Sequence, residues 1–348
     1  MRTIDLGSTG LRVSRLAFGA SSYGSRDWMP WALSEDDAQP HYRAAFEHGF
    51  NFFDTAESYS SGLSEEILGR AVKRYGPGRD KVVIATKVGL AKGDETSHGL
   101  SRKRIRHAIE GSLRRLGTDY VDLYQIHRLD PRTPLEEVML ALDDAVRAGK
   151  VLYVGASSMH AWQFATLQQL AERNGLARFS TMQNKYNLLY REEERETLPL
   201  CLHQGVAVLP YSPLARGLLA GSRRQDTERS RVVRDFVRPE DERVVDRVIQ
   251  VADERGVKPA QIALAWLLHN PAVTAPIVGA TRVGHLDDAV AALDIVLTAE
   301  ELDRLEAPYV PQQVQLDRNV APAPGQTASP DLLPLFRRRS GITPARAA

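Results

Sequence analysis

The 348-residue sequence predicts a (β/α)8 barrel, and three observations support that fold class. Short apolar runs alternate with helical patterns from about residue 15 to about residue 290. Eight such units in roughly 280 residues fit a closed barrel of parallel strands better than an open doubly wound sheet. No Gly-x-Gly-x-x-Gly motif follows the first apolar run, which weakens the open-sheet, dinucleotide-binding alternative.

The strands are predicted from eight apolar runs. These are residues 15–19, 50–54, 82–87, 121–127, 152–156, 179–183, 206–210 and 275–279. Because helical patterns separate the runs, we expect the strands to be parallel and to be joined by crossover connections.

The helix predicted after residue 133 carries signals for both of its ends. Thr133 is expected to cap it, Pro134 to occupy its first position and Glu136 to complete a capping box. Gly149 is typical of a helix end. A further helix is predicted from the apolar positions Ile105, Ala108, Ile109, Leu113 and Leu116, and it is expected to stop at Gly117.

Two segments, residues 2–14 and 311–348, lie outside the repeating pattern, and a third, residues 221–242, interrupts it within the barrel. Residues 2–14, with Gly7 and Gly10 between short apolar stretches, predict a hairpin that plugs the N-terminal end of the barrel. Residues 221–242 are rich in charge and poor in apolar side chains, which predicts a long loop. We expect residues 1–310 to form a single barrel and residues 311–348 to form an extended or disordered tail.

Composition narrows the classes of function. Lys and Arg number 45 against 44 Asp and Glu, so the net charge of +1 gives no reason to expect a nucleic-acid or membrane-surface partner. The single cysteine, Cys201, excludes an intramolecular disulfide framework and a cysteine-rich zinc site. The apolar runs are far shorter than the roughly 18 residues of a membrane span, and the N-terminus lacks the apolar core of a secretory signal. The sequence therefore predicts a cytoplasmic protein.

Polar side chains end several of the predicted strands. Asp54, Lys87 and His127 each lie at the end of a different apolar run, and Ser157, Gln183, Tyr211 and Ser212 occupy the same place in later units. Because active sites of such barrels lie at the carboxyl ends of the strands, we expect these side chains to converge. The alternative for each residue taken alone is a strand terminator that faces solvent.

Tyr59 lies in the loop just after Asp54 and can fold back over the barrel mouth. A neighbouring Lys87 ammonium would favour the phenolate and lower the pKa of the tyrosine, while Asp54 would keep the lysine charged. The expected result is a proton donor usable near neutral pH. The alternative for Tyr59 is an aromatic ring packed on a loop.

Five stretches, residues 54–59, 62–69, 85–87, 114–127 and 209–219, resemble the aldo-keto reductases. The likeness extends from the N-terminal hairpin to about residue 310 and is nearest to the branch with aryl-alcohol-dehydrogenase-like enzymes and potassium-channel β subunits. It implies NADPH-dependent reduction of an aldehyde or ketone to an alcohol. It further implies that Tyr59 is the general acid, that Lys87 and Asp54 tune it, and that His127 orients the carbonyl.

The same resemblance implies a set of NADP(H) contacts. Ser157 and Gln183 match positions that bind the nicotinamide carboxamide, Tyr211 matches the ring on which nicotinamide stacks, and Thr281 and Arg282 match partners of the 2′-phosphate. The pyrophosphate loop matches Ser212, Pro213, Leu214, Ala215, Arg216 and Gly217, and the remaining positions are Gly19, Ala20, Ser21, Asp54, Ser158, Gly279, His285 and Asp288. Because a guanidinium suits a phosphate, Arg282 favours NADPH over NADH.

The chain departs from the family pattern on the cofactor side. Ser157-Ser158 stands where Ser-Asn is common, Gly221-Ser222 stands where a lysine commonly follows the glycine, and His285 and Ala289 replace polar amides near the adenosine. These changes lie at cofactor positions and leave Asp54, Tyr59, Lys87 and His127 unchanged.

Trp28 and Trp31, in the loop after the first strand, are candidates to line a substrate pocket with Tyr59 and His127, or else pack within that loop. No metal site is predicted, because no His-x-x-x-His pair with a nearby carboxylate appears. Two alternatives to an active reductase of small carbonyl compounds remain: an NADPH-binding sensor or regulatory subunit, and a metal- or carboxylate-dependent barrel lyase. The sequence makes no prediction of the oligomeric state.

Overall fold

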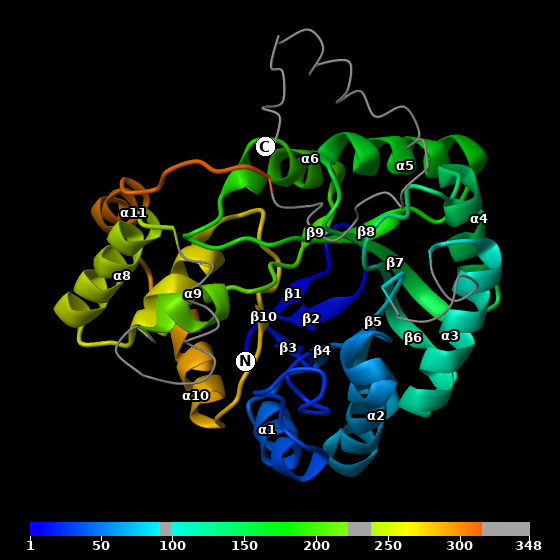
Figure 1. Ribbon diagram of the computed structural model, residues 1–348, viewed down its shortest axis with the longest axis horizontal. Coiled ribbons are helices and arrows are strands. Elements are labelled where there is room, and N and C mark those ends of the chain that lie inside the picture. Colours follow the sequence, from blue (N-terminus) through cyan, green and yellow to red (C-terminus); the bar gives the residue numbers. More distant parts are fainter. Residues whose placement is uncertain (91–98, 222–237, 315–348) are drawn as a thin grey trace, which may run out of the picture.

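Eight parallel strands form the centre of the fold (Figure 1). The computed structural model describes residues 1–90, 99–221 and 238–314. The strands are β3 (Ala17–Gly19), β4 (Phe52–Asp54), β5 (Val83–Val88), β6 (Val121–Ile126), β7 (Val151–Ser157), β8 (Phe179–Gln183), β9 (Ala207–Val208) and β10 (Ile277–Val278). Each lies within or beside one predicted apolar run, and the strand order is β10-β3-β4-β5-β6-β7-β8-β9.

The ring closes between β9 and β10, the two ends of that order. The backbone N–H groups of Thr274 and Ile277 donate to the carbonyl oxygens of Val208 (2.9 Å) and Pro210 (2.8 Å). On the other side of β10, Arg15, just before β3, holds the segment that precedes β10, because its Nη2 donates to the carbonyl oxygen of Leu268 (2.9 Å). These contacts confirm the predicted (β/α)8 barrel.

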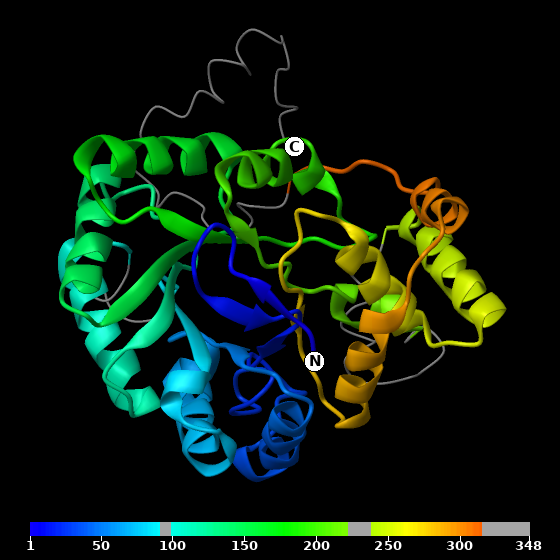
Figure 2. The same cartoon turned by 180° about the vertical axis from the view of Figure 1, so that it is seen from behind.

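Helices surround the strands on the outside of the barrel (Figures 1 and 2). They are α1 (Glu35–Glu47), α2 (Leu63–Tyr75), α3 (Arg102–Leu116), α4 (Leu135–Arg147), α5 (Ala161–Asn174), α6 (Thr197–Gln204), α8 (Asp241–Arg255), α9 (Pro259–His269), α10 (Gly284–Ala291) and α11 (Ala299–Glu306). No helix among the described residues is long and apolar enough to cross a membrane.

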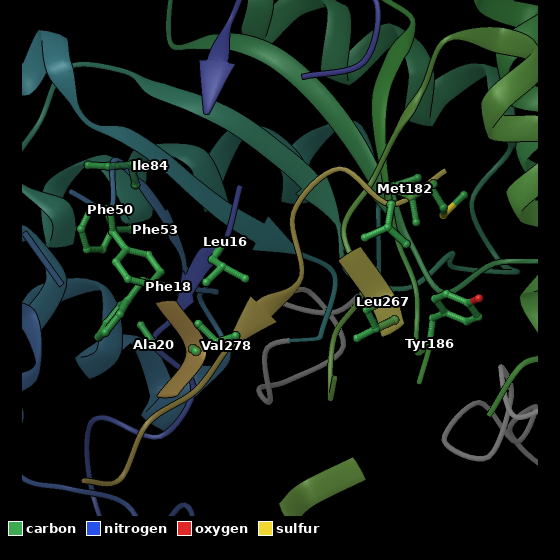
Figure 3. Packing of buried hydrophobic residues seen from close by; sticks show 14 of the residues in the cluster. Leu16, Phe18, Ala20, Phe50, Phe53, Ile84, Met182, Tyr186, Leu267 and Val278 are labelled. Carbon is green, nitrogen blue, oxygen red and sulfur yellow. The ribbon is translucent and has the colours of Figure 1, made fainter. Parts of the chain in front are cut away.

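Successive side chains along each strand point alternately outward and inward, which divides the core into a layer under the helices and a layer inside the barrel. In β4, Phe53 faces the helices, and its ring lies 5.5 Å from that of Phe18 in β3 (Figure 3). Phe52 belongs instead to the cluster inside the barrel, with Val83 and Leu123. Both faces of these parallel strands are therefore apolar near their amino ends, which explains why the runs read as continuously hydrophobic.

The N-terminal hairpin closes one end of the barrel, as predicted. Strands β1 (Thr3–Asp5) and β2 (Arg12–Ser14) pair antiparallel and cross the barrel opening (Figure 2). Leu6 and Val13 are fully buried against the interior cluster. Gly7 has φ +61°, and an added Cβ would overlap the carbonyl oxygen of Gly205, so the tip requires glycine.

The predicted ends of α3 and α4 had different outcomes. The five apolar positions of α3 are buried, and Gly117 ends the helix at φ 63°. In α4, Pro134 is the N-cap rather than the first helical residue, and no side chain caps the helix. The capping-box prediction was wrong because the Thr133 hydroxyl donates to Asp130 Oδ2 (2.7 Å) and is already engaged outside the helix.

Two further predictions are tested only in part. Residues 222–237 of the predicted long loop lie outside the described residues, and its last two residues, 241 and 242, begin α8 instead. Carboxylates are favourable in the first turn of a helix, which the loop prediction overlooked. Of the predicted tail, residues 311–314 have no regular structure, with the Gln312 N–H donating to Glu192 Oε1 (2.8 Å), and residues 315–348 lie outside the described residues. The domain boundary at 310 stays a prediction.

Candidate active site

The carboxyl ends of β4, β5 and β6 bring four predicted side chains together. Asp54 ends β4, Lys87 lies near the end of β5, His127 follows β6, and Tyr59 begins the short 3-10 helix η1 (Tyr59–Gly62). Lys87 Nζ donates to Asp54 Oδ1 (2.5 Å) and lies 3.3 Å from the Tyr59 hydroxyl. The predicted convergence is therefore present.

Lys87 is fully buried, yet its ammonium is well provided with acceptors. In addition to Asp54 and Tyr59, it donates to the carbonyl oxygen of Thr55 (2.8 Å). Burial lowers the pKa of Lys87, but the charge of Asp54 and the hydrogen bonds outweigh burial, so its pKa is raised overall. The lysine is thus a fixed cation behind the Tyr59 hydroxyl.

Asp54 is held from both sides. Its Oδ2 accepts hydrogen bonds from Gln183 Nε2 (2.9 Å) and Gln125 Nε2 (3.2 Å), while Oδ1 accepts from Lys87. A buried carboxylate is stable only when its oxygens are paired in this way. Gln125 was not predicted from the sequence, although it lies two residues before His127 on the same face of β6.

His127 stands against Tyr59 as a neutral imidazole. The ring centroids lie 5.6 Å apart at an interplanar angle of 82°, and Ser58 Oγ is 3.5 Å from Nδ1. Burial, followed by the charges of Lys87 and Arg128, lowers the pKa of His127 well below its ordinary value. The neutral ring can donate one hydrogen bond into the cleft.

The pKa of Tyr59 corrects the sequence-based prediction. Lys87 lowers this pKa, as expected, but burial raises it more, and the pKa lies above its ordinary value of 10.0. The prediction considered the ammonium and omitted the removal of the phenol from water, which disfavours the phenolate. Tyr59 therefore holds its proton firmly at neutral pH.

A cleft of about 960 Å³ opens over these side chains. Most of the predicted site residues line it: Gly19, Ser21, Trp31, Asp54, Tyr59, His127, Ser157, Gln183, Tyr211, Ser212, Pro213, Leu214, Arg216, Gly217, Gly279, Thr281, Arg282, His285 and Asp288. Residues far apart in the sequence thus share one continuous surface.

Five predicted residues do not line the cleft. Lys87 and Ala20 are buried behind it, Ser158 lies beneath it with Oγ 3.4 Å from the Tyr211 hydroxyl, and Ala215 and Trp28 are also outside the lining. Of the two predicted tryptophans, only Trp31 is thus placed to contact a bound molecule directly.

Several lining residues were missed. They are Ser22, Arg128, Ala220, Lys258, Pro259, Ala260, Leu264, Ile277, Val278 and Gly284, whereas Ala289, named above as a departure near the adenosine, also lines the cleft. Arg128 could have been found, because it directly follows His127 at a strand end. Lys258 could not, because nothing in the sequence shows that the start of α9 reaches the cleft.

The backbone around the cleft adopts unusual conformations. Among the described residues, the positive φ angles of non-glycine residues occur at Ser60, Ser61, Ser158, Ser212, Ala215 and Arg216. All six lie in the loop after Tyr59 or at positions predicted to bind the cofactor. Such conformations cost free energy and concentrate at functional sites.

Two fully buried asparagines support these strained loops. Asn184 Oδ1 accepts a hydrogen bond from the Ser158 N–H (3.2 Å), and Asn187 Nδ2 donates to the Ser212 carbonyl oxygen (2.9 Å). Each asparagine fixes a backbone group that has left the regular strand geometry.

The residues present fit a nicotinamide dinucleotide. The cations Arg216, Lys258 and Arg282 line the cleft, where phosphates would need them, and Lys258 Nζ also pairs with Asp288 Oδ1 (2.7 Å). Near Tyr59, Ser157 and Gln183 offer hydroxyl and amide groups to a carboxamide. In the part of the chain that the structure describes, no three His, Cys, Asp or Glu side chains gather as metal ligands.

Comparison with known proteins points to one family. A model of the aldo/keto reductase family matches residues 15–309. A versiconal hemiacetal acetate reductase from Aspergillus parasiticus is 44% identical over 340 residues, which cover 90% of this chain and 98% of that protein. An aldo-keto reductase from Metarhizium robertsii is 43% identical over 345 residues, covering 90% and 92%. A Saccharomyces cerevisiae protein whose name provisionally assigns it to the aryl-alcohol dehydrogenases is 40% identical over 341 residues, covering 90% and 98%.

Proposed function

Because the chain belongs to the aldo/keto reductase family and is an oxidoreductase acting on CH–OH groups, we propose that it reduces an aldehyde or ketone to an alcohol with NADPH and that Tyr59 donates the proton. The observation that carries the proposal is the position of Lys87 Nζ, 2.5 Å from Asp54 Oδ1 and 3.3 Å from the Tyr59 hydroxyl. A fixed cation beside a buried phenol stabilises the phenolate that proton donation leaves behind.

The proposed reaction balances one hydride with one proton. When bound, the cofactor supplies hydride to the carbonyl carbon and is thereby oxidised. The Tyr59 O–H bond breaks, and its proton passes to the carbonyl oxygen, which becomes the alcohol. Neutral His127 donates a hydrogen bond to the same oxygen and orients it. A proton from solvent restores Tyr59 after the product leaves.

The cofactor is proposed to lie along the cleft. Its nicotinamide end contacts Ser157, Gln183 and Tyr211, which line the cleft beside Tyr59. Its 2′-phosphate contacts Thr281 and Arg282, and the guanidinium favours the phosphorylated cofactor through charge-assisted hydrogen bonds.

Replacing Tyr59 by Phe tests the proton donor. We expect NADPH oxidation with a panel of aldehydes to fall about 100-fold or more, with the dissociation constant of NADPH nearly unchanged. Tyr75→Phe, at the end of α2, is the matched control and should keep full activity. Equal turnover in Tyr59→Phe would show that the proton comes from another group. Tight NADPH binding by the wild type without reduction of any aldehyde would favour a sensor.

Replacing Arg282 by Ala tests the choice of cofactor. The expected result is a larger rise in the dissociation constant of NADPH than in that of NADH, because only NADPH carries the 2′-phosphate. Fluorescence titration of the two cofactors measures both constants. Parallel losses would reject the assignment of Arg282 to the 2′-phosphate.

A further inference from the structure

The cleft wall contains a cation that the proposed reaction does not use. Arg128 directly follows His127 after β6, is half-buried, and lines the cleft together with Tyr59 and Ser157. Its Nη1 donates to the carbonyl oxygen of His127 (2.8 Å) and lies 3.4 Å from Ser157 Oγ. Within the described ranges, its Nε and Nη2 have no hydrogen-bond partner, and no carboxylate forms an ion pair with it.

The carboxylates of the cleft do not compensate this charge. Asp54 and Asp288 are the two carboxylates among its lining residues, and they pair with Lys87 (2.5 Å) and Lys258 (2.7 Å). Arg128 therefore leaves a positive charge beside the proposed position of the substrate carbonyl. A half-buried cation in this setting gains by pairing with an anion.

The charge of Arg128 reaches the reacting groups. It contributes, after burial and Lys87, to the lowered pKa of His127, and it opposes the burial that raises the pKa of Tyr59. The guanidinium thus lies within electrostatic range of both side chains that are proposed to contact the carbonyl oxygen.

Arg128 also stands on a fixed loop. Two residues further on, Asp130 Oδ2 accepts hydrogen bonds from Thr133 Oγ1 (2.7 Å) and the Leu100 N–H (3.2 Å), and Oδ1 accepts from the Arg132 N–H (3.0 Å). The loop is ordered by its own contacts, so the guanidinium is positioned before any ligand arrives.

We propose that Arg128 determines substrate specificity by binding an anionic group, and that the preferred substrates are aldehydes or ketones with a carboxylate near the carbonyl. The proposal rests on the proposed function, which places the carbonyl oxygen at Tyr59 and His127. Nε and Nη2 lie on one side of the guanidinium and match the two oxygens of a carboxylate, which a point-charge cation such as lysine does not.

Paired aldehydes test this proposal in turnover. Benzaldehyde is compared with the ortho, meta and para isomers of carboxybenzaldehyde, whose carboxylates are ionised at neutral pH. At saturating NADPH, we expect Arg128→Gln to lose about 10- to 100-fold in kcat/KM for the best acid, but less than about threefold for benzaldehyde. Arg128→Lys should recover only part of the loss. Arg132→Gln is the matched control, because Arg132 is on the same loop, is exposed and does not line the cleft.

Three results would overturn the proposal. An equal loss for benzaldehyde and the acids would make Arg128 a general contributor to catalysis or to folding of the site. A matching rise in the dissociation constant of NADPH would assign Arg128 to the cofactor. A wild type that prefers no acid isomer over benzaldehyde also contradicts it.

A binding experiment separates this proposal from the reaction itself. Benzoate and its neutral isostere benzamide are titrated by calorimetry into the protein with and without NADPH. Tighter binding of benzoate that is lost in Arg128→Gln supports the anion site, and equal binding of the two ligands overturns it. If the wild type reduces no aldehyde, the proposed function fails, and this titration still decides on Arg128 because it needs no turnover.

Discussion

The two ends of the barrel are built from the same strands and differ in almost every physical respect. At the amino end, Leu6 and Val13 of the hairpin are fully buried against Phe52 and Val83. At the carboxyl end, the same strands β4 and β5 carry a buried ion pair. One end is an apolar core, and the other holds charge and strained backbone.

The difference shows that unfavourable free-energy contributions are concentrated at the carboxyl end of the barrel, and stabilising ones at the amino end. Burying a charge and holding non-glycine residues at positive φ are both unfavourable. Among the described residues, the non-glycine residues with positive φ all flank the cleft. The apolar cluster at the amino end of the barrel (the apolar base) and the core between strands and helices supply the stability that offsets these costs. Substitutions at the two ends should therefore affect different measurements.

Among such substitutions, Lys87→Met should have the largest effect, and the effect should be on catalytic activity. Removing the ammonium leaves Asp54 without its cation and the Tyr59 phenolate without stabilisation, so kcat should fall about 100- to 10,000-fold. Lys81→Met, just before the amino end of β5, removes an exposed lysine and should change kcat little. Steady-state rates of NADPH oxidation measure both, and similar losses would erase the contrast between the ends.

Leu6→Ala should change stability and leave catalysis alone. The substitution opens a cavity in the apolar base and should lower the free energy of unfolding by about 2 to 4 kcal/mol. Leu202→Ala on α6, where the leucine is 53% exposed, should cost much less. Urea unfolding gives the free energies, and kcat at moderate temperature should be unchanged in both variants.

Ala215→Gly should reveal the strain of the carboxyl end. Ala215 has φ 47°, and relief of this conformation exceeds the entropy cost of glycine, so a gain of about 0.5 kcal/mol is expected. Ala291→Gly, at an exposed position of the regular helix α10, should instead lose about 0.5 to 1 kcal/mol. Opposite signs in urea unfolding would confirm the strain, and a loss in both would contradict it.

The pH dependence of reduction should be almost flat. The pKa of Tyr59 is raised above its ordinary value of 10.0, so the donating proton is lost only as the pH rises through that higher value. The pKa of His127 is lowered, so its neutral form is lost only as the pH falls well below 6.5. Between about pH 6.5 and about pH 9, kcat should therefore stay constant. A decline of kcat centred near neutral pH would contradict this and would support the lowered pKa of Tyr59 predicted from the sequence.

The sequence predicted the barrel because eight apolar runs alternate with helical patterns, and it predicted the convergence of Asp54, Lys87 and His127 because each lies at the end of one of those runs. Tyr59 was added because it lies in the loop just after Asp54. Phe52 and Asp54 share the inward face of β4, as Ala85 and Lys87 do in β5, so a polar residue two positions after an inward apolar residue marks the mouth. The motif resemblance then supplied the roles and the cofactor.

The features that could not be predicted from the sequence depend on contacts that only the folded chain defines. The pKa of Tyr59 reflects desolvation, which only a packed structure defines. Lys258 reaches the cleft through the placement of α9, and the start of α4 depends on a competing hydrogen bond to Asp130. The first two require tertiary contacts that periodicity does not encode, and the third is a local hydrogen bond between residues three apart that competes with capping of the helix.

The junction of β9 with β10 gives the ring a preferred place to open. The long strands β6 and β7 share an extended ladder, whereas at this junction two short strands rely on a few backbone hydrogen bonds. Amide protons of Thr274 and Ile277 should thus exchange with deuterated solvent sooner than those of β6. Because β10 also pairs with β3, opening at this junction would leave β10 attached to the first strand of the barrel and separated from β9, its neighbour in chain order.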